Sequence, residues 1–228
     1  MPLKQTTHFM KSGVARLLGA LAFFGFCGCS FLQPHADPTR FYVLTAPNIS
    51  SERMAEGDFK QLKIGLKPVE MPAYLRGRLM VVRTGTNEIH FSEFERWAEP
   101  LDQGIARVMK QALGTSTNVA SVTLNSHGDD RLDYEVEIRV VACEGVRGEK
   151  GNSSIRFTAT WEVSGLGTNS TAITRGGFTA GTAVWDAKSF GQLAERLSQA
   201  IIAASQALAA DLPMSVRTPT AITVKTKP

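Results

Sequence analysis

Few residues of this chain could do covalent or acid–base chemistry, and they lie far apart. Beyond residue 39 the sequence holds only two histidines, His90 and His127, and one cysteine, Cys143. Nucleophilic catalysis needs a Cys or Ser paired with a His, and no Gly-x-Ser-x-Gly motif accompanies these residues. We expect Cys143 to continue the polar side of a strand as an exposed thiol with no catalytic role.

An acidic stretch is the second place where chemistry could occur. Three carboxylates surround Phe94 and Trp97, namely Glu93, Glu95 and Glu99. Paired carboxylates can hydrolyse glycosides, but acidic residues before a helix also stabilise the positive end of its dipole. We favour the second role, because a helix is expected to follow Pro100. No His, Cys, Asp and Glu spacing is typical of a metal site, so we predict no catalytic residue, no metal and no bound cofactor.

Composition limits the class of protein. The chain has 228 residues, 43% hydrophobic and 20% charged, which is typical of a folded domain. The net charge is +4, but three basic residues and no acidic residue lie in the first 28 positions, so the remainder is close to neutral. A near-neutral domain without a basic stripe is a poor nucleic-acid binder, and we expect no nucleic-acid partner.

The amino terminus has the charge order of a secretory signal. Lys4, Lys11 and Arg16 precede an uncharged apolar run, Leu17 to Phe26. At ~1.5 Å per residue, a helix of this length covers about half of the ~30 Å hydrocarbon core of a bilayer. We therefore predict a signal peptide over residues 1–28 and not a membrane-spanning helix.

Two cysteines follow this run directly. Gly28 precedes Cys29, whereas the bulky Phe26 precedes Cys27, and the stretch looks like a lipobox, the acylation site of bacterial lipoproteins. Two cysteines one residue apart are too close for an ordinary disulfide. We expect Cys29 to carry covalent diacylglycerol and an N-acyl chain, which together give stable membrane attachment. By the same resemblance, Ser30 directs the protein to the outer membrane.

Pattern changes divide the rest of the chain. Residues 29–39, with Pro34 and Pro38, form a lipidated tether, and residues 214–228 read as a disordered tail. Between them, residues 40–213 are expected to fold as one domain.

Hydrophobic periodicity predicts the elements of that domain. Strands are expected at 41–44, 62–66, 79–83 and 88–91, a long hairpin at 132–140 and 155–163 with its turn at 145–152, and a weaker strand at 178–184. Helical spacing appears from Pro100 to Gly114 and from about Asp186 to Pro213. This order predicts the α/β class of the α+β type, with two main helices covering one face of a mixed, mostly antiparallel sheet.

Several segments together resemble one known family. These are Ile64-Gly65-Leu66-Lys67-Pro68-Val69-Glu70-Met71-Pro72-Ala73-Tyr74-Leu75, Val81-Val82-Arg83-Thr84-Gly85, Trp97-Ala98-Glu99-Pro100-Leu101 and Arg40-Phe41-Tyr42-Val43-Leu44. The combination is similar to the PqiC (YmbA) family of ABC-type transport auxiliary lipoproteins. The chain departs from the family in its loose lipobox and at Arg76-Gly77-Arg78, where the family often has an acidic residue.

The resemblance implies a non-enzymatic role. Such a lipoprotein is anchored to the outer membrane, faces the periplasm and works with an MCE-domain (PqiB-like) protein and inner-membrane transport components. The system moves lipids between the membranes and maintains the envelope. A stand-alone structural lipoprotein that binds envelope components is the alternative function, a periplasmic hydrolase is the least favoured, and a homo-oligomer stays open.

Residue types suggest where a partner binds. Tyr74, Arg83 and Trp97 are of the kinds that dominate interface energies, and they lie within or beside the family motifs. The segments 72–83 and 93–97 are therefore the expected partner surface, the second of them as a loop. The alternative is that Tyr74 and Trp97 fill the core, which we favour for Tyr74 and leave open for Trp97.

Overall fold

A computed structural model describes residues 36–46, 61–129, 131–148, 152–167, 170–171 and 173–213. The chain divides into two units, residues 1–38 and 39–228, and the second contains the strands and helices described below. The predicted signal peptide, Cys29, most of the tether and the tail at 214–228 lie outside the described residues.

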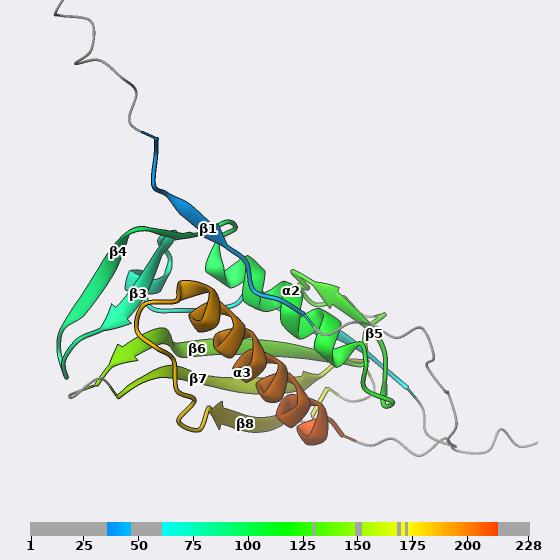
Figure 1. Cartoon of the computed structure of the whole chain (residues 1–228). Helices are drawn as coiled ribbons and strands as arrows, with labels where there is room; N and C mark the ends of the chain where they lie inside the picture. The colour runs from blue at the N-terminus through cyan, green and yellow to red at the C-terminus, as the bar shows by residue number, and fades with distance from the viewer. Residues whose placement is uncertain are drawn as a thin grey trace, which may run out of the picture. The chain divides into compact units, whose positions relative to one another are not determined.

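Eight strands form one open, mixed sheet (Figure 1). Their bounds are β1 (Arg40–Tyr42), β2 (Leu62–Leu66), β3 (Leu79–Arg83), β4 (Ile89–Trp97), β5 (Val119–Leu124), β6 (Tyr134–Arg147), β7 (Ser153–Gly165) and β8 (Ile173–Thr179). The order is β1-β4-β3-β6-β2-β5, with β7 on the other side of β6 and β8 beyond it.

The long strand β6 organises this sheet. One edge of β6 pairs antiparallel with β7 along its whole length, which confirms the predicted hairpin. The other edge pairs in parallel with β2 at its start and with β3 at its end. Between β2 and β3 the chain continues along β6, where Glu70 N–H donates to Ile138 O at 3.0 Å and Glu70 O accepts from Val140 N–H at 2.8 Å. The segment 67–76 thus lies at a gap in the sheet, between two strands that β6 holds in register.

Two helices, α2 (Leu101–Leu113) and α3 (Phe190–Asp211), pack against one face of the sheet (Figure 1). Their buried residues recur at three- and four-residue steps, as an amphipathic helix requires. In α3 the Ser189 hydroxyl accepts a hydrogen bond from Gln192 N–H, which satisfies one free donor of the first turn. The α+β class and the two predicted helices are confirmed.

The strands differ from the expected ones in three places. Strand β5 was not expected. Its buried residues, Val119 and Val122, are three positions apart and so do not show the two-residue period of a strand, because the pairing with β2 contains a register shift. The segment 93–97 is not a loop, since β4 extends to Trp97 with a largely exposed surface that lacks alternation. The third strand is Ile173–Thr179 and not 178–184, because this edge strand carries Thr, Arg and Gly in place of apolar residues.

A β-bulge overturns two further expectations. The pairing of β6 with β7 shifts between Val140 and Ala142, so Val141 is an extra residue and the faces exchange beyond it. Cys143 therefore faces the core with 2% exposure and is not an exposed thiol. β6 also continues through Gly145, which was expected in the turn; a Cβ at this position would lie 2.8 Å from Trp185.

Candidate functional site

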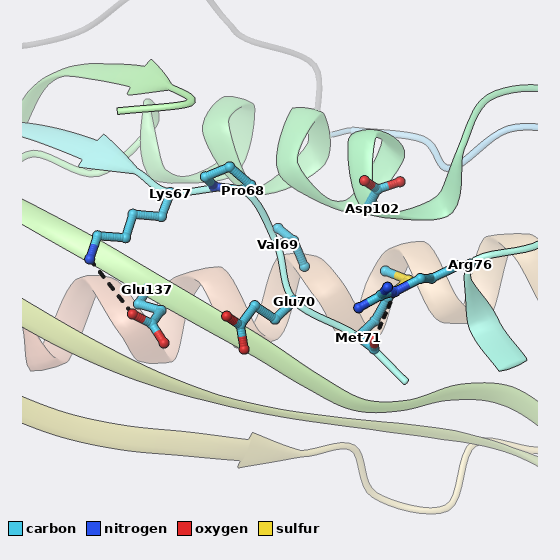
Figure 2. A pocket seen from close by; sticks show the side chains of 8 residues that line it. All are labelled: Lys67, Pro68, Val69, Glu70, Met71, Arg76, Asp102 and Glu137. Carbon is cyan, nitrogen blue, oxygen red and sulfur yellow. Dashed lines mark hydrogen bonds and ion pairs between the residues drawn. The ribbon is translucent and has the colours of Figure 1, made fainter. Parts of the chain in front are cut away.

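The segment 67–76, which carries the sharpest family motif, forms one wall of a groove (Figure 2). The groove has a volume of about 490 Å³ and lies against β6 and the first turn of α2. Five of its eight lining residues are charged. The lining consists of Lys67, Pro68, Val69, Glu70, Met71, Arg76, Asp102 and Glu137. A second hollow of about 360 Å³ continues from Glu70, Met71 and Arg76 over Val140 and the bulged Val141.

Ion pairs across the rim of the groove tie the segment to β6. Lys67 Nζ lies 3.6 Å from Glu137 Oε2, and Arg139 Nη2 lies 3.0 Å from Glu70 Oε2. At the far end Arg76 Nε donates to the backbone oxygen of Met71 at 3.3 Å. These groups are largely exposed, so their net contribution to folding is small, but they leave charges of both signs available to a partner. The charged side chains at the rim suit a polypeptide surface with complementary charges.

A second cluster lies on the face of the sheet opposite the helices. The Arg83 Nε donates to Glu144 Oε1 at 2.6 Å, and Arg83 Nη1 donates to the backbone oxygen of Thr86 at 3.0 Å. The Glu144 side chain is completely buried, and Arg156 Nη1 lies 3.8 Å from it. Tyr74, in the short 3₁₀ helix η2 (Ala73–Leu75), is half-buried, and its hydroxyl interacts with both Glu144 and Arg83. The cluster therefore fixes the end of the motif segment onto β3 and β6.

The cluster shifts the pKa values of its members. Burial, followed by the charge of Glu144, raises the pKa of the Tyr74 hydroxyl, and the hydrogen bond to Glu144 raises the pKa of Arg83. At the residue of β6 that precedes Glu144, burial raises the pKa of the Cys143 thiol to about 12. All three groups therefore stay protonated at neutral pH, which suits binding and packing and not nucleophilic chemistry.

The structure brings two of the residues predicted for the site together and separates the third. Tyr74 and Arg83 meet at Glu144. The sequence did not indicate Glu144 as a site residue, because its burial depends on the bulge at Val141. Trp97 lies in the core with 4% exposure. Of the two roles left open for it, partner surface and core, the structure therefore supports the core. Cys29 lies outside the described residues.

The other chemistry-bearing residues are dispersed. His90 and Glu93 are exposed on β4, and His127 Nδ1 contacts the backbone oxygen of Asn125 at 2.8 Å. Glu99 Oε1 lies 2.5 Å from Arg107 Nη2 of α2, so Glu99 forms an ion pair with this helix. In the part of the chain that the structure describes, no group of His, Cys, Asp and Glu could hold a metal ion. Within the same residues, no helix has the length and apolar character needed to cross a membrane.

Comparison with known proteins gives one family and one fold. A family model described as ABC-type transport auxiliary lipoprotein component matches residues 42–212. A crystal structure of an uncharacterized protein is 15% identical with a TM-score of 0.57, and the match covers 77% of this chain and 99% of that chain. A crystal structure of a Xanthomonas campestris protein is also 15% identical, with a TM-score of 0.58 and coverage of 74% and 92%. No curated protein sequence matches the chain.

Proposed function

The chain belongs to the family of ABC-type transport auxiliary lipoprotein components, and on that premise we propose that it is the outer-membrane-anchored, periplasmic subunit of an intermembrane lipid transport system. In this role it binds partner subunits and performs no catalysis itself. Its partners are an MCE-domain protein and the inner-membrane transport components.

The extent of the family match carries this proposal. Residues 42–212 run from the end of β1 to the residue after α3, so the match includes the other seven strands and both helices. The transport role is therefore a property of the folded unit. The finer assignment to lipid transport rests on the motifs at 64–75, 81–85 and 97–101.

Attachment to the membrane is assigned to Cys29. The family is described as one of lipoproteins, which supports an acylated cysteine, and Cys29 follows a small residue at the end of the apolar run. A diacylglycerol together with an N-acyl chain provides the two hydrophobic signals that stable anchoring needs. Ser30 supports placement in the outer membrane.

The groove formed by residues 67–76 is the proposed contact with the partner. Its rim presents Lys67, Arg76 and Arg139 beside Glu70 and Glu137, so that a partner with complementary charges can be selected and oriented. The buried Arg83–Glu144 pair below Tyr74 holds one end of this segment in place before binding. Preorganisation of this kind lowers the entropy cost of association.

Movement of lipid in cells tests this function. Phospholipid is pulse-labelled in a strain that lacks the chain, and its distribution between inner and outer membrane is followed over time. We expect an altered rate of exchange that the wild-type chain restores and the Cys29→Ser variant does not, with Cys27→Ser as the matched control that restores it. An unchanged rate in the deletion strain would overturn the proposal.

A further inference from the structure

Exposed apolar side chains gather on β1, the residues that follow it, and β4. Phe41 is 60% exposed, Phe91 42% and Phe94 38%, and Val43 is also exposed. We call these four residues the β1–β4 surface. Isolated exposed apolar residues are ordinary, but a group of them on neighbouring elements indicates a contact with another body.

Strand register places much of this surface on one face of the sheet. Phe41 is opposite Arg96 in the parallel pairing of β1 with β4, and Arg96 is opposite Leu79 of β3. Phe91 is opposite Val81, which lies two residues from Leu79 and so on the same face. Phe41, Phe91 and Arg96 therefore point to the side away from the helices, since Tyr42, the neighbour of Phe41, packs on Phe190 of α3.

The residues after β1 are fixed firmly to the domain. Leu44 is buried in the core, and its backbone oxygen accepts a hydrogen bond from Arg107 Nη2 at 2.8 Å. Thr45 N–H donates to the Ser198 hydroxyl of α3 at 2.9 Å. Because both helices hold this segment, a force or contact at β1 acts on the whole domain.

Chain length brings this surface close to the membrane. Phe41 lies only 12 positions after the proposed anchor, Cys29. A fully extended chain of that length spans at most about 40 Å. β1 is therefore the strand with the shortest chain connection to the bilayer, and the edge opposite to it, β8, has the longest.

We propose that the β1–β4 surface docks on the phospholipid headgroups of the membrane that holds the acyl anchor. This rests on the anchoring assigned under the proposed function. Aromatic side chains favour the boundary between headgroups and acyl chains, and the Arg96 guanidinium, which takes part in no ion pair among the described residues, suits a lipid phosphate. Docking would orient the domain, so that its partner groove takes a fixed position relative to the bilayer.

Fluorescence quenching by labelled lipids tests the docking. The full-length acylated protein, carrying Phe91→Cys or Phe94→Cys labelled with bimane, is reconstituted into vesicles of phosphatidylethanolamine and phosphatidylglycerol. A spin-labelled phosphatidylcholine in the same vesicles quenches fluorophores at the headgroup boundary. The control is Ile173→Cys on β8, which is apolar and 55% exposed, whereas the natural Cys143 is buried and stays unlabelled. Phe91 is the sharper probe, because it lies 62 residues from Cys29 and is not held near the bilayer by the tether alone.

We expect lipid quenching at positions 91 and 94 to exceed that at 173 several-fold. Equal quenching at the three positions, in protein that floats with the vesicles, would overturn the docking while leaving the anchor intact. Labels that lipid does not quench but that are shielded from aqueous iodide would also overturn it, since they would show that a second copy covers this surface. Failure of the protein to float would overturn both the docking and the proposed anchoring.

Discussion

The guanidinium of Arg83 and the carboxylate of Glu144, 61 residues apart in the chain, form a 2.6 Å ion pair that also interacts with the Tyr74 hydroxyl. The Glu144 side chain has no exposed surface, whereas 18% of the Arg83 side chain is exposed. The pair joins β3 to β6 at the end of the motif segment, where the two strands run parallel. The position of the groove therefore depends on the buried carboxylate of Glu144, whose charge the Arg83 guanidinium compensates.

Removal of the arginine is expected to destabilise the protein strongly. Arg83→Leu leaves the buried Glu144 carboxylate without its main partner, and breaking a buried pair in this way costs about 3–5 kcal/mol. Urea unfolding measures the loss. The matched control is Arg175→Leu, which removes an arginine from the exposed 2.8 Å pair with Glu162 and should cost less than about 1 kcal/mol. Equal effects of the two variants would contradict the structural role of the buried pair.

The contribution of Glu135 to stability should depend on pH. Burial alone would raise the pKa of Glu135, but hydrogen bonds from Gly128 N–H and the Ser126 hydroxyl and the charge of Lys67 outweigh it and lower the pKa. A lowered folded-state pKa stabilises the protein above the unfolded-state pKa, and the stabilisation is lost as the pH falls through the folded-state value.

We therefore expect Glu135→Gln to lower the free energy of unfolding by about 1–2 kcal/mol at pH 7. The difference from wild type should shrink below about pH 4, where the carboxyl of the unfolded chain is protonated. Denaturant unfolding at both pH values measures it. A difference that is constant with pH would show that the charge of Glu135 is not what stabilises the fold.

The Cys143 thiol should be inert in the folded protein. It is 2% exposed, and burial followed by the charge of Glu144 raises its pKa to about 12. At pH 8 we expect a thiol reagent to modify Cys143 only as fast as the protein unfolds, and at once in concentrated urea. Phe41→Cys adds an exposed thiol as the positive control. Rapid modification of Cys143 in the native protein would contradict the shifted register beyond the bulge.

Charge reversal in the groove should weaken binding of the partner. Arg139→Glu breaks the pair with Glu70 at the rim and changes the charge that the groove presents. Arg175→Glu is the matched control, because it breaks an exposed Arg–Glu pair on β8 at the other side of the sheet. We expect the recovery of partner per mole of chain, measured by quantitative mass spectrometry, to fall several-fold for Arg139→Glu alone. An equal recovery for both variants would place the contact elsewhere.

Periodicity predicts the elements that bury one face and expose the other. The hairpin of β6 and β7 and the helices α2 and α3 have this pattern, and the structure confirms them. The end of β4 and the position of β8 were wrong, because β4 is largely exposed and β8 is an edge strand with little apolar surface. The sequence contains no local signal for the parallel pairing of β2 and β3 with β6, because these contacts join residues far apart in the chain.

The candidate site was predicted in part for a related reason. Tyr74 and Arg83 could be chosen by residue type, but their common partner Glu144 could not be. The burial of Glu144 depends on one extra residue, Val141, and a single-residue bulge reverses which side chains face the core. The same shift explains why Cys143 was expected at the surface.

Purification of the tagged full-length protein from its own membranes tests whether it is a subunit of a lipid transport system. The protein is extracted in a mild detergent, and mass spectrometry identifies the proteins and lipids that accompany it. We expect recovery of an MCE-domain protein and phospholipid together with a chain acylated at Cys29. Recovery of the acylated chain alone, even after cross-linking in cells, would contradict the transport role and favour a stand-alone envelope lipoprotein.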